Sequence, residues 1–237
     1  MARKRAGNQS EMRWQILLAA TRLFLENGYT LTSLRAIADE AGVNIGSLMH
    51  LFPSKEEILE QLVEQVIECQ FAAARQMVRG KTEDRLLFYA AETALQLHIV
   101  ESCERLRDVY NCAYSLPRPS ARIQQIMTGK VEQIFREHLP DLQTRDFYKL
   151  EIASAGIMRG FMTIPCHMWF TMDQKIDSFL ESAFLIYRVP DETIREATAF
   201  VRQFDFPTYV QMARQLMLEK LAGEEDPEPN GGNDNEK

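Results

Sequence analysis

The 237-residue chain is poor in the residues that interrupt regular structure, with 11 glycines and 9 prolines. A sandwich or barrel of many short strands needs turn residues between its strands, so this scarcity argues against an all-β fold. A content of 46% hydrophobic and 26% charged residues is that of an ordinary globular protein and excludes disorder for most of the chain. The composition therefore favours a helical globular protein.

Cysteine pairs, secretion signals and membrane-spanning runs are also missing. The chain has four cysteines, which are Cys69, Cys103, Cys112 and Cys166. They show no C-x-x-C spacing and no cationic and apolar signal segment precedes them, so we expect reduced core thiols in a cytoplasmic protein. The longest apolar stretch, residues 157–170, contains Arg159 and His167 and is too short to span a bilayer. We therefore expect no association with a membrane.

Motifs of enzyme and metal chemistry are likewise not found. The sequence has no G-x-S-x-G, no phosphate-binding glycine loop, no H-E-x-x-H and no paired carboxylates in an apolar setting. His98 and Glu101 share one face of an expected helix, and Cys166 adjoins His167, but further ligands at a metal-binding spacing are missing. We predict that the protein is not an enzyme and holds no metal and no cofactor.

The net charge of −7 is distributed unevenly along the chain. Residues 1–55 hold seven Lys and Arg against four Asp and Glu, whereas residues 223–237 hold one Lys against six acids. A basic head on an acidic body meets a polyanion at one end only. This distribution excludes a protein that coats nucleic acid regardless of sequence.

Apolar periodicity predicts helices along almost the whole chain. The first helix is expected over residues 11–27, because Ile16, Leu17, Ala20 and Phe24 share one face. Residues 1–10 lack such a pattern and are predicted to form a flexible basic arm. Two short helices follow, one after Thr32 or Ser33 as its cap and one from Asn44 to about Leu51, with Gly42 in the turn. Two short helices across such a turn form a helix-turn-helix.

The remaining pattern predicts a second, larger helical domain. A capping box, Ser54 with Glu57, begins a long helix to about Arg79. Further helices are expected over residues 82–115, 120–138, 144–170, 173–188, 191–204 and 207–221. We therefore predict an all-α chain with an arm at 1–10, a helix-turn-helix DNA-binding domain at 11–55, a larger helical domain at 56–222 and a disordered acidic tail at 223–237.

The segment from Gly28 to Ile58 resembles the N-terminal signature of the TetR family of transcriptional regulators. The matching groups are Gly28-Tyr29, Thr32-Ser33, Ile37-Ala38, Ala41-Gly42-Val43, Gly46-Ser47-Leu48, Phe52 and Ser54-Lys55-Glu56-Glu57. The resemblance covers about the first sixty residues. It departs from the family pattern at Met49, His50 and Leu51, where the family commonly has aromatic residues.

Side chains on the exposed face of the second short helix are expected to reach base edges in a major groove. By position these are Asn44, Ile45, Ser47 and His50. The resemblance places phosphate or groove contacts at Thr32, Ser33, Arg35 and Lys55, and the arm adds Arg3, Lys4 and Arg5. One such module buries little surface, so we predict a homodimer that binds a near-palindromic DNA operator.

The resemblance implies a dimer built by late helices and a small-molecule effector bound in the middle of the chain. The apolar stripes that we assign to the dimer interface are Phe179, Leu180, Ala183, Phe184 and Tyr187, with Val210, Ala213 and Met217. An apolar or aromatic effector is expected to contact His98, Tyr110, Tyr114, Met158, Phe161, Met162, Cys166 and Trp169. For the dimer residues and for the apolar effector residues alike, the alternative is ordinary packing inside one subunit.

These expectations combine into a repressor that an effector releases from DNA. Two alternatives remain. One is an activator, or a regulator of the same fold that responds to no ligand. The other is a helical small-molecule-binding protein or enzyme whose N-terminal motif only packs.

Overall fold

The computed structural model describes residues 2–223, and within that range the chain consists of eleven helices and no strand. The all-helical fold expected from the sequence is therefore confirmed. The helices are α1 (Ala2–Leu31), α2 (Leu34–Glu40), α3 (Ile45–Leu51), α4 (Lys55–Val78), α5 (Arg85–Glu101), α6 (Glu104–Ser115), α7 (Pro117–Phe135), α8 (Thr144–Thr163), α9 (Met172–Ile186), α10 (Asp191–Val201) and α11 (Phe206–Gly223). None of these described helices combines the length and the hydropathy that crossing a bilayer requires.

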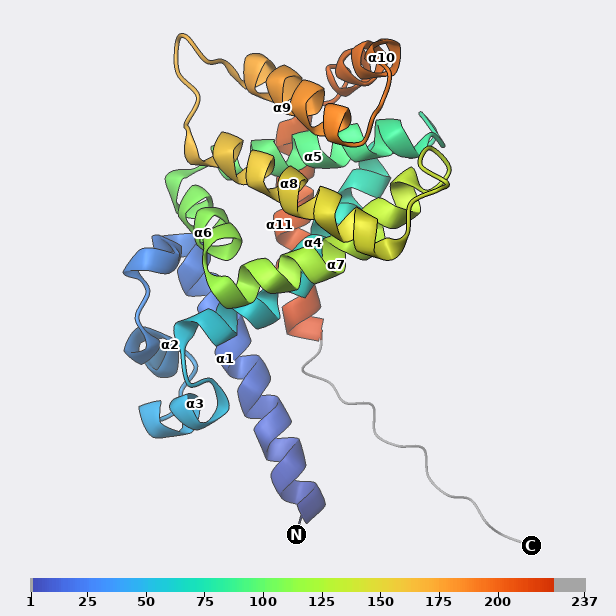
Figure 1. Cartoon of the computed structure of the whole chain (residues 1–237). Helices are drawn as coiled ribbons and strands as arrows, with labels where there is room; N and C mark the ends of the chain where they lie inside the picture. The colour runs from blue at the N-terminus through green and yellow to red at the C-terminus, as the bar shows by residue number, and fades with distance from the viewer. Residues whose placement is uncertain (1, 224–237) are drawn as a thin grey trace, which may run out of the picture.

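The helices form two bodies that share α4 (Figure 1). Helices α1 to α3 make the small N-terminal body, and α4 leads from it into the larger body of α5 to α10. Helix α11 packs along α4 and α5 and also reaches α1, so the last helix of the chain contacts the first. The predicted apolar faces are buried, including Ile16 and Phe24 of α1 and Leu62 and Val63 of α4.

Helix α1 is longer than the sequence pattern indicates. Its backbone is helical from Ala2, so the expectation of a flexible arm over residues 1–10 is not met by the described backbone. The side chains of Arg3, Lys4 and Arg5 lie outside the described side chains. At the other end Gly28 interrupts the helix, as expected, with φ 82° and ψ 169°. The predicted tail over residues 223–237 lies, apart from Gly223, outside the described residues.

Three helix boundaries also differ from the prediction. The helix expected over residues 82–115 is two helices, because the backbone of Cys103 is extended and begins α6. Helix α7 begins at Pro117, since proline is accepted in a first turn that lacks intrahelical N–H partners. Helix α8 ends at Thr163, two residues before Pro165, and a loop with mutual His167–Phe170 backbone hydrogen bonds leads to α9.

Candidate nucleic-acid interface and cavity

Two short helices, α2 and α3, form the predicted helix-turn-helix, and local hydrogen bonds fix each of them. The Ser33 hydroxyl caps α2 by accepting the N–H of Ala36 at 3.1 Å, and the Asn44 Oδ1 caps α3 by accepting the N–H of Ser47 at 2.8 Å. Between them Gly42 has φ 66°, the left-handed conformation that a tight turn requires. Bonds within the chain therefore cap both helices and fix the turn between them.

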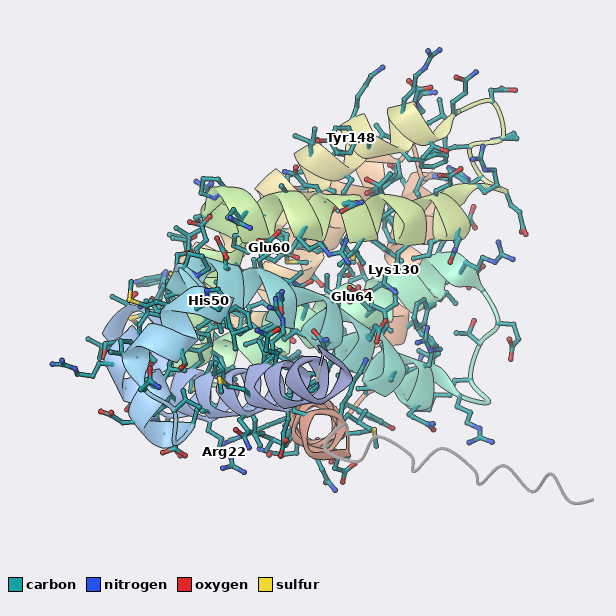
Figure 2. All side chains as sticks on the ribbon, turned by 90° about the horizontal axis from the view of Figure 1, so that it is seen from below. Arg22, His50, Glu60, Glu64, Lys130 and Tyr148 are labelled. Atoms are coloured by element: carbon teal, nitrogen blue, oxygen red, sulfur yellow. The ribbon has the colours of Figure 1, made fainter. Side chains whose placement is uncertain are left out.

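Helix α3 buries one face and exposes the other. Leu48 and Phe52 are fully buried, and the Arg13 guanidinium of α1 lies 4.5 Å from the centre of the Phe52 ring. Asn44 and His50 are exposed, while Ile45 and Ser47 are half-buried. All four side chains predicted to read DNA thus lie at or beside the solvent face of α3. Figure 2, which shows the molecule from below, labels His50 on α3.

Sequence reasoning missed Met49 as a member of this face. Its side chain is 51% exposed, one of the few large apolar side chains in the described chain that lie open to solvent. The signal that could have found it is its position next to His50 on a helix whose inward residues are Leu48 and Phe52. Leu31, the last residue of α1, is 82% exposed and was also missed.

Two of the predicted phosphate contacts are turned toward the protein itself. Thr32 is buried, and its hydroxyl donates to the carbonyl of Gly28 at 2.7 Å, so it is not available to a phosphate. The Lys55 ammonium donates to the carbonyls of Tyr29 and Thr32 at 2.6 and 2.7 Å. It also lies 4.1 Å from the centre of the Tyr29 ring, and burial lowers the pKa of Lys55. Ser33 and Arg35 remain exposed.

Helix α6 holds the end of α1 through contacts that we call the α6 clamp, formed by Arg105 and Asp108 with Glu26 and Thr30. The Asp108 carboxylate accepts the backbone N–H of Thr30 at 2.7 Å and its hydroxyl at 2.6 Å. The Arg105 guanidinium donates to the carbonyl of Glu26 at 2.6 Å. A Cβ at Gly28 would lie 2.8 Å from Asp108 Oδ2, so this close approach requires glycine. The clamp joins the small body to the large one.

Helix α4 is fixed to the larger body by ion pairs at its first turns. Ser54 caps it by accepting the N–H of Glu57 at 3.2 Å, as predicted. The Glu57 carboxylate pairs with Arg118 of α7 at 2.7 Å, and Glu60 pairs with the same guanidinium at 2.7 Å. Figure 2 shows Glu60 and Glu64 along α4 beside α7. The position of the helix-turn-helix therefore depends on α6 through the α6 clamp on α1, and on α7 through its ion pairs with α4.

A cavity of about 360 Å³ lies between the two bodies. Its walls come from α1, α4, α6 and α11, with additions from α5 and α7. Apolar side chains such as Phe24, Leu62, Val66, Leu106, Val109 and Met217 make most of the wall. Gln70 and Tyr110 are buried polar members, whereas Glu26, Arg105 and Arg214 are exposed and form its rim. A ligand here would touch both bodies at once.

Of the predicted effector contacts, the structure brings only Tyr110 to this cavity. Met158 and Met162 are buried in the core, Tyr114 bonds to Gln96 at 2.7 Å, and Phe161 packs against Phe170. Cys166 and Trp169 lie in the loop before α9, where Trp169 is 78% exposed. Apart from Tyr110, these residues lie away from the cavity, since no residue of α8 or of the loop after it is in its wall.

His98 lies at a separate pocket of about 290 Å³ formed by α5, α9 and the α10–α11 connection. Its ring stacks on Phe206 with centroids 4.1 Å apart. Burial lowers the pKa of His98 to about 4, so the ring is neutral at physiological pH. Glu101, its neighbour on the same helix, pairs with the buried Lys175 at 2.7 Å. No group of three metal-ligating side chains occurs within residues 2–223.

The predicted dimer residues are buried within one subunit, where the chain's own helices cover them. All of them, Phe179, Leu180, Ala183, Phe184, Tyr187, Val210, Ala213 and Met217, are at most 9% exposed. The α9 stripe packs on Tyr89 and Phe135 of the same chain, and Val210, Ala213 and Met217 line the cavity. An apolar helix face has the same sequence pattern whether it packs inside a subunit or between subunits.

The fold and the site define a helix-turn-helix protein with a larger helical domain. The family model of the bacterial regulatory proteins, tetR family, matches residues 16–62. The chain therefore carries the TetR-family N-terminal domain, and the resemblance of residues 28–58 is confirmed. The match includes α2, α3 and the first turns of α4.

The chain is similar to named transcriptional regulators, and its fold is similar to that of a solved structure. HTH-type transcriptional repressor KstR2 of Mycobacterium tuberculosis is 37% identical over 97 residues, covering 39% of this chain and 48% of that protein. The chain thus spans about half the length of this relative. HTH-type transcriptional activator FasR of Mycolicibacterium smegmatis is 25% identical over 181 residues, covering 73% of this chain and 80% of that protein. The crystal structure of RolR with resorcinol superposes with a TM-score of 0.64 at 16% identity, covering 83% of this chain and 95% of that one.

Proposed function

We propose that the protein is a transcriptional regulator that binds a near-palindromic DNA operator as a homodimer and releases it when a small effector binds. The observation that carries this proposal is the open face of α3 on the helix-turn-helix. A recognition helix anchored at Leu48 and Phe52 presents its other side to the major groove. The assignment of residues 16–62 to the TetR-family domain supports the same function.

The proposed base contacts are Asn44, Ile45, Met49 and His50, with Ser47 beside them. The Asn44 amide N–H₂ stays available for a base because its Oδ1 is used by the helix cap. Ile45 and Met49 present apolar surface suited to thymine methyl groups. Ser33 and Arg35 are proposed phosphate contacts, since both are exposed at the start of α2. Arg3, Lys4 and Arg5 remain proposed backbone or minor-groove contacts.

The dimer is proposed to form through the outer face of α8 and the adjoining part of α9. Tyr148 and Ile152 of α8 are each 45% exposed, and Leu185 of α9 is 64% exposed. Gly156 continues the Ile152 face four residues on, and a Cβ there would have no neighbour within 4 Å. Exposed apolar side chains beside a glycine, which has no side chain to obstruct close approach, favour packing against a helix of a second copy. Figure 2 shows Tyr148 at the edge of the molecule far from His50.

The effector is proposed to act through the cavity between the bodies. A molecule there touches α1, α4 and α6 together, which are the helices that set the position of the helix-turn-helix. An effector that binds more tightly when these helices have moved apart weakens operator binding. The operator must then weaken effector binding by the same factor. Changing operator occupancy from nearly full to nearly empty takes a differential affinity of about 5.5 kcal/mol.

Titration of the full chain with a palindromic segment from its own upstream DNA tests operator binding. We expect saturable binding whose log K falls linearly with log salt, because Lys and Arg displace counterions from phosphates. His50→Ala is expected to weaken specific binding about tenfold and to leave nonspecific binding unchanged. Glu196→Ala, on the exposed surface of α10, is the control. Absence of saturable binding, or a salt slope near zero, contradicts the proposal.

Sedimentation of Ile152→Arg tests the dimer. We expect a monomer with unchanged helix content by circular dichroism, because two buried guanidinium groups would repel each other at the two-fold axis. The control is Ile164→Arg, which places the same charge on a side chain 50% exposed in the loop after α8. A variant that remains dimeric at Ile152 rules out this face.

Activation is the second candidate function. It is favoured by the similarity to FasR, named an activator, which extends over 73% of this chain, whereas the similarity to the repressor KstR2 covers 39%. Measuring transcripts of the neighbouring genes with and without the protein separates the two. Repression predicts higher transcript levels without the protein, and activation predicts lower ones.

A further inference from the structure

The wall of the interbody cavity has one buried polar region. Gln70 of α4 and Tyr110 of α6 are 5% and 8% exposed, and both line the cavity among apolar side chains. Thr21, another buried polar member of the wall, already donates its hydroxyl to the carbonyl of Leu17 at 2.9 Å. Hydrogen bonding between a ligand and the inner wall is therefore concentrated at Gln70 and Tyr110.

Gln70 and Tyr110 have hydrogen-bond positions that their contacts within the protein leave unused. The Tyr110 hydroxyl donates to Gln70 Oε1 at 3.1 Å, and Gln70 Nε2 donates to Glu92 Oε1. A carboxamide has two N–H groups and two acceptor positions. Among the described contacts these bonds occupy one of each, which leaves Gln70 with one donor and one acceptor. The phenol oxygen of Tyr110 is also free to accept a hydrogen bond.

A buried carboxyl group stands behind this pair. Glu92 is 1% exposed, and its Oε2 has no hydrogen-bond partner among the described residues. Burial raises the pKa of Glu92 to about 7, so the group is partly ionised near neutral pH. Its negative charge opposes an anion at the inner wall, and Gln70 lies between it and the cavity. An ammonium ion would have to leave water for an apolar cavity without direct contact to this carboxylate.

From this arrangement we infer that the effector is a largely apolar, uncharged alcohol or phenol whose hydroxyl group binds between Gln70 and Tyr110. A hydroxyl group donates one hydrogen bond and accepts others, which matches the unused donor and acceptor of Gln70. The apolar remainder of the molecule lies along α4, α6 and α11. This inference rests on the proposed effector role of the cavity and specifies its chemistry.

Three probes with one shared body test the inference on the full chain without DNA. They are para-propylphenol, propylbenzene and para-propylbenzoate, titrated by calorimetry near neutral pH. We expect the phenol to bind about tenfold tighter than the hydrocarbon, because its hydroxyl group satisfies buried polar atoms. The benzoate is expected to bind more weakly than both. A benzoate that binds as tightly as the phenol, or a set of three that does not bind at all, overturns the inference.

Variants locate the preference within the cavity. Gln70→Leu is expected to remove the advantage of the phenol, and Tyr110→Phe is expected to reduce it by about threefold. Tyr110→Phe keeps the ring and serves if Gln70→Leu fails to fold. Val66→Ala, on the apolar wall, should change the affinity for all three probes together. A phenol preference that survives in both Gln70→Leu and Tyr110→Phe places the hydroxyl group elsewhere and contradicts the inference.

Operator release is measured separately with the same probes, so that the two proposals fail in different ways. Binding with the expected preference but without DNA release leaves the ligand chemistry intact and contradicts the effector role of the cavity. Release by all three probes alike supports the effector role and contradicts the hydroxyl preference.

Discussion

The helix caps around the helix-turn-helix and the buried Gln70 of the larger body satisfy their polar groups in opposite ways. In the first, Ser33, Asn44 and Ser54 each bond to a backbone N–H three residues further along the chain. In the second, Gln70 bonds to residues 22 and 40 positions away. Local bonds form with the helix itself, whereas distant ones depend on how helices pack. The caps therefore form independently of how the two bodies pack, whereas the bonds of Gln70 require α4, α5 and α6 to be in place.

The largest expected effect comes from Gly28, where the two bodies meet. Gly28→Ala should destabilise the chain by about 3 kcal/mol, because the residue has a positive φ and its new Cβ would lie 2.8 Å from Asp108 Oδ2. Urea denaturation measures the change. Gly129→Ala, where a Cβ meets nothing within 4 Å in α7, should instead stabilise by about 0.5–1 kcal/mol. Equal changes in the free energy of unfolding at both positions would contradict a special role of Gly28 at this junction.

The buried carboxyl of Glu92 should make stability depend on pH in the larger body. Burial raises its pKa from 4.5 to about 7, so the folded chain retains a proton that the unfolded chain has already released. Stability is therefore greatest below pH 4.5 for this group and falls as pH rises toward about 7. Glu92→Gln should recover roughly 2–3 kcal/mol at pH 8. Denaturation across pH 5–8 tests this, with the exposed Glu196→Gln as a control expected to keep the original profile.

A local cap should matter less than either of these. Ser54→Ala removes the acceptor for the N–H of Glu57 and should cost about 1 kcal/mol in urea denaturation. Ser54→Asp, which retains a capping acceptor, should restore most of the loss. Failure of the aspartate to restore stability would mean that this helix start depends on Arg118 rather than on its cap.

The smallest expected effect distinguishes a positioning lysine from a phosphate contact. If Lys55 only holds the carbonyls of Tyr29 and Thr32, Lys55→Met should weaken operator binding without changing its salt slope. Arg35→Ala removes an exposed cation and should reduce the slope by about one. An equal reduction of the salt slope in Lys55→Met would instead support the direct phosphate contact that the family resemblance implies.

The same contrast explains which predictions from sequence were correct. The caps at Ser33, Asn44 and Ser54 were predictable because each involves residues three apart, and the buried positions of α3 follow from helical spacing. Burial of the α9 stripe was not predictable, because helix periodicity reports an apolar face and not the partner that covers it. The cavity also escaped prediction, since its walls join α1 to α11 across most of the sequence.

The break between α5 and α6 escaped prediction for a related reason. Neither glycine nor proline occurs near Ser102 and Cys103, and the apolar pattern continues through them. The break is set by tertiary contacts, since α6 must turn to bring Asp108 to Thr30. Those two residues are 78 positions apart, beyond the range of any local pattern.

The contacts that α6 and Lys55 of α4 make with the end of α1 and the turn after it are largely to peptide groups. Arg105 binds the carbonyl of Glu26, Asp108 binds the N–H and the hydroxyl of Thr30, and Lys55 binds the carbonyls of Tyr29 and Thr32. Peptide groups are the same whatever side chain they bear. In a regulator of the kind proposed, substitutions on the outward face of α3 can therefore alter which DNA sequence is preferred while these contacts between the two bodies stay unchanged.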